Sequence, residues 1–198
     1  MSEIEGFILA GGASSRMGRD KARLRLGGET FVARIARALG TIAARVSVVS
    51  SRPDGAEFRL PVVTDIYAGR GPLGGLHAAL NACRAPWAAV VSCDLPFVSG
   101  ALWTRLARLC ADGFDAVAPL QADGQVQPLC ALYARAACLA RAAELLRTGE
   151  SRPRMLLAQV RTRLVAPDEL ADLTDAELLL MNINTPTDYR KAGMRDEG

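Results

Sequence analysis

The sequence has 198 residues, of which 50% are hydrophobic and 23% charged, and its formal net charge is +3. This composition excludes a disordered chain and predicts one folded domain over residues 1–198. The small net charge does not favour nucleic-acid binding, and no apolar run approaches membrane-spanning length. Five cysteines without a Cys-x-x-Cys pair are typical of reduced, buried thiols, so we expect a cytoplasmic protein.

Apolar runs alternate along the chain with segments of helical spacing, and no repeat or linker interrupts them. The expected strands cover residues 4–10, 45–50, 60–64, 88–93, 114–119, 128–133 and 162–166. The expected helices cover residues 30–44, 73–83, 100–110, 136–147, 153–160 and 185–193. Continuous apolar strands between helices predict an α/β fold with a parallel or mixed sheet that is covered on both faces.

The first expected strand runs into a glycine-rich segment, "LAGGASSRMGRDK", that carries Arg16 and Lys21. It matches neither the Walker A pattern nor G-x-G-x-x-G. Its glycines nevertheless allow backbone N–H groups to approach an anion, and the two cations would neutralise phosphate. Only Lys21 and Lys191 are lysines among 24 basic residues, which indicates a need for a compact ammonium group. We predict a triphosphate site, with an ordinary strand-to-helix turn as the alternative.

Two aspartates, Asp65 and Asp94, each follow an expected strand. Ligands of open α/β sheets bind beyond the carboxyl ends of the strands, so these side chains are candidates for one site. Asp94 suits Mg²⁺, which takes one or two carboxylates together with phosphate oxygens. Its alternative role, capping the helix near Ser99, is one that Ser99 itself can fill. Asp65 can bind the metal, a ribose or a base, or only form the turn.

Asn182 and Asn184 share one side of an extended segment, "MNINTPTDY", because side chains alternate in such a backbone. Their amides suit a metal, a phosphate or a pterin, whereas capping of the following helix needs Asn184 alone. His77, the single histidine, is interpreted as a packing residue, and Trp87 and Trp103 as core anchors.

The opening segment resembles the L-A-G-G-x-S-x-R-M-G-x-D-K signature of the molybdenum cofactor guanylyltransferases, the MobA family. Further elements of the same family follow in order: "TDIYAGRGPLGGLHAAL", "SCDLPFV", "QPLCALY" and "NINTPTDY". The resemblance implies a single nucleotidyltransferase domain with a Rossmann-like, mostly parallel sheet flanked by helices (GT-A-like). It also implies transfer of GMP from GTP to the terminal phosphate of molybdenum-molybdopterin, with release of pyrophosphate and use of Mg²⁺.

The resemblance further implies the role of individual residues. GTP would be held by residues of three motifs: Leu9, Ala10, Gly11, Gly12, Arg16, Lys21, Asp65 and Asp94. The catalytic set would be Arg16, Lys21 and Asp94, with Asp94 on the metal, and Asn182 and Asn184 would face the pterin or the metal. Ser50 or Ser51 stands where the family suggests an asparagine, and Arg152 and Arg154 align equally well with a family arginine, so these contacts stay open.

Two other functions are compatible with the same motifs. One is the CTP-dependent molybdopterin cytidylyltransferase, which typically opens L-A-A-G where this chain has Leu9-Ala10-Gly11-Gly12. The other is an inactive pterin-binding chaperone, against which the retention of Lys21 and Asp94 argues. The expected partners are GTP, molybdenum-molybdopterin and proteins of cofactor biosynthesis or molybdoenzyme maturation, without nucleic acid or membrane.

Overall fold

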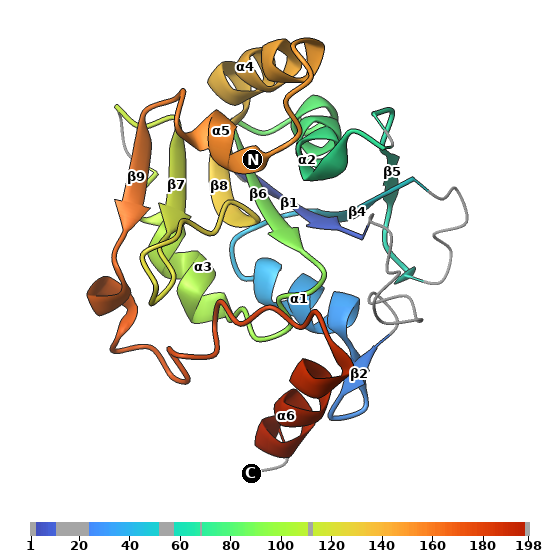
Figure 1. The fold of residues 1–198 in the computed structure, drawn as a ribbon, viewed down its shortest axis with the longest axis vertical. Coiled ribbons are helices and arrows are strands. Elements are labelled where there is room, and N and C mark those ends of the chain that lie inside the picture. Colours follow the sequence, from blue (N-terminus) through green and yellow to red (C-terminus); the bar gives the residue numbers. More distant parts are fainter. Residues whose placement is uncertain (1–2, 11–23, 52–57, 68, 111–112, 197–198) are drawn as a thin grey trace.

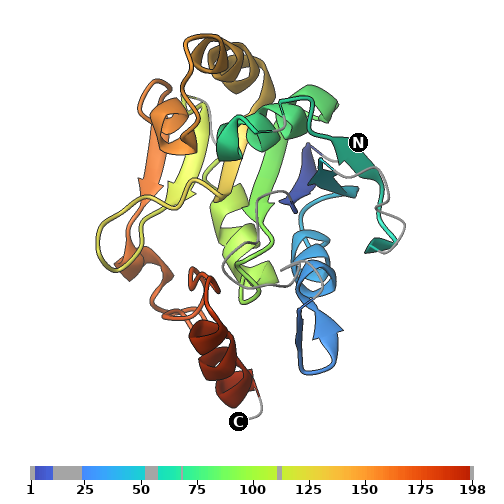
Figure 2. The same ribbon diagram turned by 45° about the vertical axis from the view of Figure 1, so that its right-hand side comes forward.

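The computed structural model describes residues 3–10, 24–51, 58–67, 69–110 and 113–196 (Figures 1 and 2). Its centre is a seven-stranded sheet in the order β5-β4-β1-β6-β8-β7-β9. The strands are β1 (Ile4–Leu9), β4 (Val46–Ser50), β5 (Val62–Thr64), β6 (Trp87–Ser92), β7 (Ala116–Pro119), β8 (Cys130–Ala134) and β9 (Thr162–Val165). All seven expected strands therefore form, with ends shifted by one or two residues in most cases.

The sheet is mixed but mostly parallel, as the sequence predicts. β1 pairs in parallel with β4 and β6, β4 with β5, and β7 with β9. β8 runs antiparallel to both of its neighbours, β6 and β7. Its first residue, Cys130, pairs with Val91 near the end of β6. The start of β8 therefore lies at the same edge of the sheet as the carboxyl ends of the parallel strands.

Helices cover both faces of the sheet (Figure 1). One face carries α2 (Gly71–Ala82), α4 (Arg135–Arg147) and α5 (Pro153–Leu157), and the other carries α1 (Phe31–Leu39) and α3 (Gly100–Ala107). In β1, Phe7 and Leu9 belong to the first apolar core and Ile8 to the second. This alternation follows from the period of two in a strand, and it explains why strands buried on both faces are continuously apolar.

Hydroxyl side chains fix where several helices begin. Thr30 Oγ1 accepts a hydrogen bond from Ala33 N (3.2 Å), and Ser99 Oγ accepts one from Leu102 N (3.2 Å). Each bond satisfies a backbone donor that the first turn of a helix leaves without a partner. Ser99 thus caps α3 as expected, which leaves Asp94 outside that role.

The structure adds a hairpin that the sequence analysis did not predict. β2 (Arg25–Leu26) and β3 (Glu29–Thr30) pair through a turn at Gly27 and Gly28, whose φ angles are +52° and +79°. Positive φ suits glycine, and strands of two residues are too short to show an alternating pattern. A short 3₁₀ helix, η3 (Pro167–Leu170), was also unexpected.

The hairpin and α6 (Pro186–Asp196) share a small core separate from the two main ones. Its buried members come from two segments far apart in the sequence, 24–31 and 183–192: Leu24, Leu26, Phe31, Ile183 and Ala192. Elsewhere in the described residues, the five cysteines are free thiols and four of them are buried, in agreement with the core role expected of them. No helix in the described ranges is long and apolar enough to cross a membrane.

Candidate active site

The carboxyl ends of β1, β4, β5 and β6 meet at one edge of the sheet. Backbone bonds continue the ladder one residue beyond β1 and β6, because Ala10 N donates to Val49 O (2.9 Å) and Cys93 N to Leu9 O (3.1 Å). Leu9 is buried and Ala10 is half-buried. The opening segment therefore leaves the sheet from a fixed point between β4 and β6. Its predicted residues Gly11, Gly12, Arg16 and Lys21 lie outside the described residues.

Asp94 lies in the turn that follows β6, next to this point. The turn is held by Leu95 N, which donates to Ser92 O (3.3 Å), and by the bond from Cys93 N to Leu9 O. Ile183 N donates to the carbonyl oxygen of Asp94 itself (2.9 Å). The backbone of Asp94 is thus fixed to two separate segments, so the half-buried carboxylate is mounted on a rigid support.

The bond from Ile183 also brings both predicted asparagines to Asp94. Ile183 is fully buried, whereas Asn182 is half-buried and Asn184 exposed on either side of it. Helix α6 is capped by Thr185, whose Oγ1 accepts from Asp188 N (3.1 Å), while Asp188 Oδ2 accepts from the N–H groups of Asn184 and Thr185. The proposed capping role of the Asn184 side chain is therefore filled by Thr185.

Asp65 lies at the other side of the same edge. It follows β5, and two strands separate β5 from β6, so the two strand ends are about 14 Å apart at ~4.8 Å per strand. Asp65 Oδ1 accepts a hydrogen bond from Tyr67 N (2.9 Å) and closes a local turn. At this separation Asp65 and Asp94 do not share one ion directly, which favours the ribose or base role among those considered for Asp65.

The glycines of α2 let the Asp65 turn pack against this helix. A Cβ atom at Gly74 would lie 2.9 Å from Tyr67 O and 3.5 Å from Asp65 Oδ1. The first distance is shorter than real Cβ contacts, and backbone does not move aside easily. Steric crowding therefore explains why glycine occupies position 74 of the "GPLGG" segment, a role that the sequence alone does not indicate.

His77 packs behind the same turn, in agreement with its interpretation as a packing residue. It is 7% exposed, its ring meets that of Tyr67 edge-on with centroids 4.9 Å apart, and Nδ1 has no hydrogen-bond partner among the described residues. Burial lowers the pKa of His77, and the nearby Asp65 carboxylate partly offsets this effect. The imidazole is therefore neutral at pH 7, as a buried packing histidine should be. Trp103 is likewise fully buried, and Trp87 is half-buried against the same core.

An ion pair distinguishes Arg152 from Arg154, the two arginines that align equally well with a family arginine. Arg152 binds Glu150 through two parallel contacts, Nε to Oε1 (2.8 Å) and Nη2 to Oε2 (2.7 Å), and hydrogen bonds from Arg152 lower the pKa of Glu150 to about 2. Arg154 is exposed on α5 and has no ion-pair partner in the described part of the chain.

At the end of β4, Ser50 is buried and Ser51 exposed, so Ser51 is the more accessible of the two.

Gln127, the first residue of "QPLCALY", is a further polar residue of this edge. Gln127 is 6% exposed, and it begins a turn in which Cys130 N donates to Gln127 O (3.3 Å). Ser92 N donates to Leu129 O (2.9 Å), so this turn lies beside the end of β6. Among the described residues, the Oε1 atom of Gln127 accepts a long hydrogen bond from Leu129 N (3.4 Å). A glutamine between apolar residues at the start of a strand was the signal that could have identified it.

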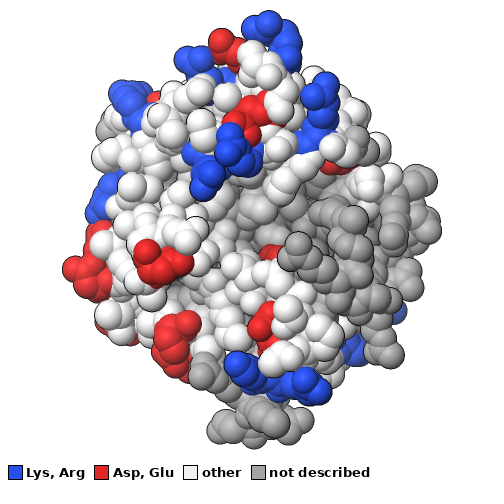
Figure 3. Space-filling model, viewed as in Figure 1, with Lys and Arg blue, Asp and Glu red and all other residues white. Residues whose placement is uncertain are grey.

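The charged side chains are distributed unevenly over the face seen in Figure 3. Lys and Arg gather at the top, over α4 and α5, and Asp and Glu at the lower left, over η3 and the segment after it. Several of these acids are paired, as Asp172 is with Arg105 (2.7 Å). The surface between the two groups is hollowed and carries few charged side chains.

The described residues can supply part of a metal shell. They contain no group of three His, Cys, Asp or Glu side chains, which a site made of protein ligands alone would need. Asp94, with its carboxylate at the site edge, fits instead an ion that keeps water and takes phosphate oxygens, as Mg²⁺ does.

Solved structures of other proteins share this fold. Molybdopterin-guanine dinucleotide biosynthesis protein A from Archaeoglobus fulgidus superposes with a TM-score of 0.82 at 22% identity, over 98% of both chains. The 2-C-methyl-D-erythritol 4-phosphate cytidylyltransferase from Thermus thermophilus gives a TM-score of 0.69 at 19% identity, over 97% of this chain and 98% of that one. The fold is that of the nucleotidyltransferases.

Sequence comparison defines the family. A family model for the MobA-like NTP transferase domain matches residues 6–164. A "Probable molybdenum cofactor guanylyltransferase" from Pelotomaculum thermopropionicum is 36% identical over all of this chain and 95% of its own, and one from Opitutus terrae is 44% identical over 82% of each. The chain belongs to the MobA-like NTP transferase family and is a nucleotidyltransferase, which confirms the resemblance found in the motifs.

Proposed function

We propose that this protein transfers GMP from GTP to the terminal phosphate of molybdenum-molybdopterin, releasing pyrophosphate and forming the guanine dinucleotide of the pterin. Residues 1–198 would act as one catalytic domain in the cytoplasm. The observation that carries the proposal is the convergence at one sheet edge of Asp94, the Asn182–Asn184 segment and the point where the opening segment leaves β1. The names of its relatives in the same family support the same substrates.

The proposed reaction needs positioning and charge rather than a general base. The attacking group is a phosphate monoester whose second pKa is near ~6, so it is largely ionised at neutral pH. Arg16 and Lys21 would neutralise the triphosphate, and the amides of the opening segment would hold it. The oxygen of the pterin phosphate attacks the α-phosphorus of GTP, and the bond to the bridging oxygen breaks as pyrophosphate leaves. The neutral, buried state of His77 is consistent with a reaction that uses no histidine.

Asp94 would hold Mg²⁺ together with phosphate oxygens and water. The bound ion would supply charge stabilisation at the α- and β-phosphates. A carboxylate suits this task when its backbone is fixed, and the bonds from Cys93 to Leu9 and from Ile183 to Asp94 fix it on both sides. Asn182 and Asn184, which flank Ile183 beside Asp94, would contact the pterin substrate or complete the metal shell.

The nucleoside would lie on the β4–β5 side of the edge. Asp65 follows β5 there, and its distance from Asp94 leaves room for a sugar between the phosphate site and the base. The opening Leu9-Ala10-Gly11-Gly12, in place of the L-A-A-G of the cytidylyltransferases, favours guanine over cytosine. Gly11→Ala should then lower the ratio of kcat/KM for GTP to that for CTP. An unchanged ratio in an active variant would place base selection elsewhere.

The decisive experiment is an assay with molybdenum-molybdopterin, Mg²⁺ and either GTP or CTP. We expect pyrophosphate release and a guanine dinucleotide product with GTP, and a much slower reaction with CTP. Faster turnover of CTP would identify a cytidylyltransferase, and pterin binding without pyrophosphate from either nucleotide would identify a binding protein. Replacing Mg²⁺ by EDTA should abolish turnover without unfolding the protein.

A further inference from the structure

We infer that the segment 183–189 is a positioning strap, in which the Tyr189 hydroxyl fixes Leu24 and Arg25, the first described residues after the opening segment, relative to Asp94. The inference rests on the proposed function for its kinetic consequence, but its structural part is independent of it. Residues 183–189 lie beyond the range 6–164 that the family model matches. The strap is therefore a contribution of the C-terminal part of the chain to the active-site edge.

The first end of the strap is the bond from Ile183 N to Asp94 O (2.9 Å). Ile183 is 0% exposed and belongs to the small core with Leu24, Leu26 and Phe31. A buried side chain anchors this backbone donor, so the bond is protected from competition with water. Displacement of the strap would therefore be transmitted to the backbone that carries the proposed metal ligand.

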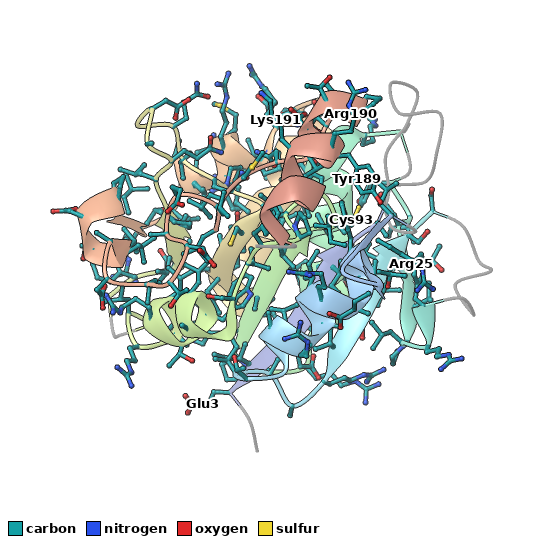
Figure 4. All side chains as sticks on the ribbon, turned by 90° about the horizontal axis from the view of Figure 1, so that it is seen from below. Glu3, Arg25, Cys93, Tyr189, Arg190 and Lys191 are labelled. Atoms are coloured by element: carbon teal, nitrogen blue, oxygen red, sulfur yellow. The ribbon has the colours of Figure 1, made fainter. Side chains whose placement is uncertain are left out.

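The second end is the bond from Tyr189 Oη to Arg25 O (2.6 Å), between residues 164 positions apart in the chain. The Tyr189 ring also contacts Phe31, with a centroid distance of 6.1 Å and an interplanar angle of 49°. Figure 4 shows Tyr189 on the side of α6 that faces Arg25, with Arg190 and Lys191 projecting away from the body. Leu24 and Arg25 are the first described residues after position 23, and Leu24 O accepts from Phe31 N (2.9 Å).

The two ends are joined by a short and locally rigid stretch. Thr185 Oγ1 accepts from Asp188 N, and Asp188 Oδ2 accepts from Asn184 N and Thr185 N. This reciprocal cap fixes the start of α6, so Ile183 and Tyr189 keep a constant separation. One end of this rigid strap is bonded to Asp94 and the other to the hairpin. The strap therefore sets the distance between the proposed metal ligand and the residues Leu24 and Arg25, which follow the proposed phosphate-binding segment.

The hydroxyl is the part of Tyr189 whose loss tests this role. The phenyl ring alone would satisfy packing against Phe31, whereas the hydroxyl adds a bond to a backbone carbonyl at the hairpin. Tyr189→Phe keeps the ring and removes only that bond. Thr187→Ala is the matched control, because it removes an exposed side-chain bond of the same helix, from Arg190 Nη2 to Thr187 Oγ1 (3.3 Å), that reaches neither end of the strap.

Hydrogen–deuterium exchange of the free proteins tests the structural part without any substrate. In Tyr189→Phe the amides of residues 24–31 should exchange about 2- to 10-fold faster, the range for loss of one neutral hydrogen bond. Thr187→Ala should exchange like wild type over the same residues. Unchanged exchange in Tyr189→Phe would overturn the inference, whether or not the protein proves to be a guanylyltransferase.

Steady-state kinetics test the positioning role. Tyr189→Phe should lower kcat/KM for GTP by about 2- to 10-fold, with the KM for the pterin substrate and the melting temperature close to wild type. Equal losses for both substrates together with a lower melting temperature would mean a structural role only, and would overturn the positioning role. Wild-type protein that releases no pyrophosphate would instead refute the proposed function, while the exchange result still decides the strap.

Discussion

Asp65 and Asp94 have the same sequence setting but different surroundings. Each follows a strand, at the same edge of the sheet. Asp65 follows the edge strand β5, and its carboxylate already accepts a hydrogen bond from Tyr67 N (2.9 Å) and lies near His77. Asp94 follows β6 inside the sheet, and its main-chain oxygen accepts from Ile183. The side chain of Asp65 closes a local turn, whereas in Asp94 it is the backbone that a distant segment holds in place.

This difference teaches that position after a strand marks a candidate, while the hydrogen bonds around it indicate its role. When a carboxylate only closes a turn, its replacement by a neutral amide, which still accepts the hydrogen bond, should change function little. A carboxylate on a fixed backbone is suited to hold an ion. Four substitutions test the comparison, from the largest expected effect to the smallest.

Asp94→Ala should nearly abolish turnover while the protein stays folded. Removal of the carboxylate that follows β6 should lower kcat on the order of 10³-fold, since charge stabilisation at the phosphates is lost. The measurement is pyrophosphate release at saturating Mg²⁺, with circular dichroism as the check on folding. Activity close to wild type in this variant would remove Asp94 from the proposed metal site.

Lys21→Arg tests whether the positive charge of the opening segment must be a compact ammonium. Arginine has equal charge but a larger planar group, so we expect a loss of about 2–4 kcal/mol in transition-state stabilisation, seen mainly in kcat/KM for GTP. Lys191→Arg, at the exposed outer side of α6, is the control and should be silent. Equal turnover of Lys21→Arg and wild type would show that any cation suffices there.

Asp65→Asn should have a smaller effect, confined to nucleotide binding. The amide oxygen can still accept from Tyr67 N, so the turn should persist and the melting temperature should change little. If Asp65 binds the nucleoside, KM for GTP should rise about 10-fold through loss of a charged hydrogen bond, with kcat nearly constant. Asp65→Ala provides the contrast, because it removes the turn as well. A collapse of kcat in Asp65→Asn would mean that the two aspartates share one role.

His77 should give the smallest effect, on the pH dependence of stability. Burial lowers its pKa in the folded state below the ordinary 6.5, so the unfolded chain binds a proton that the folded chain does not. Stability should therefore fall as the pH drops below about 6.5, by at most about 1.4 kcal/mol per pH unit for one proton. His77→Phe should flatten this part of the curve, measured by urea unfolding between pH 7 and 5. Asp65→Asn should steepen it, because the carboxylate favours the protonated imidazole. Identical curves for wild type and His77→Phe would assign the dependence to other groups.

Most of the fold could be predicted because its strands and helices are long enough to show their periods. The missed hairpin has strands of two residues, and the helix expected over 30–44 ends at Leu39, where Gly40 follows. The site was predicted as a set of strand-end residues, yet the separation of Asp65 from Asp94 depends on strand order, which local patterns do not contain. The bond from Ile183 to Asp94 depends on a contact between distant segments, which one sequence does not reveal.

The small core shared by the hairpin and α6 has a consequence for how the protein is made. Leu24, Leu26 and Phe31 leave the ribosome early, but Ile183 and Ala192, which bury them, are translated near the end of the described chain. Until then these apolar side chains lack their cover, and nascent chains with such surfaces are prone to aggregation. The first main core can close earlier, because its last buried member is Leu157, whereas the second also needs Leu179. The hairpin should thus be the part of the nascent protein that relies longest on chaperones.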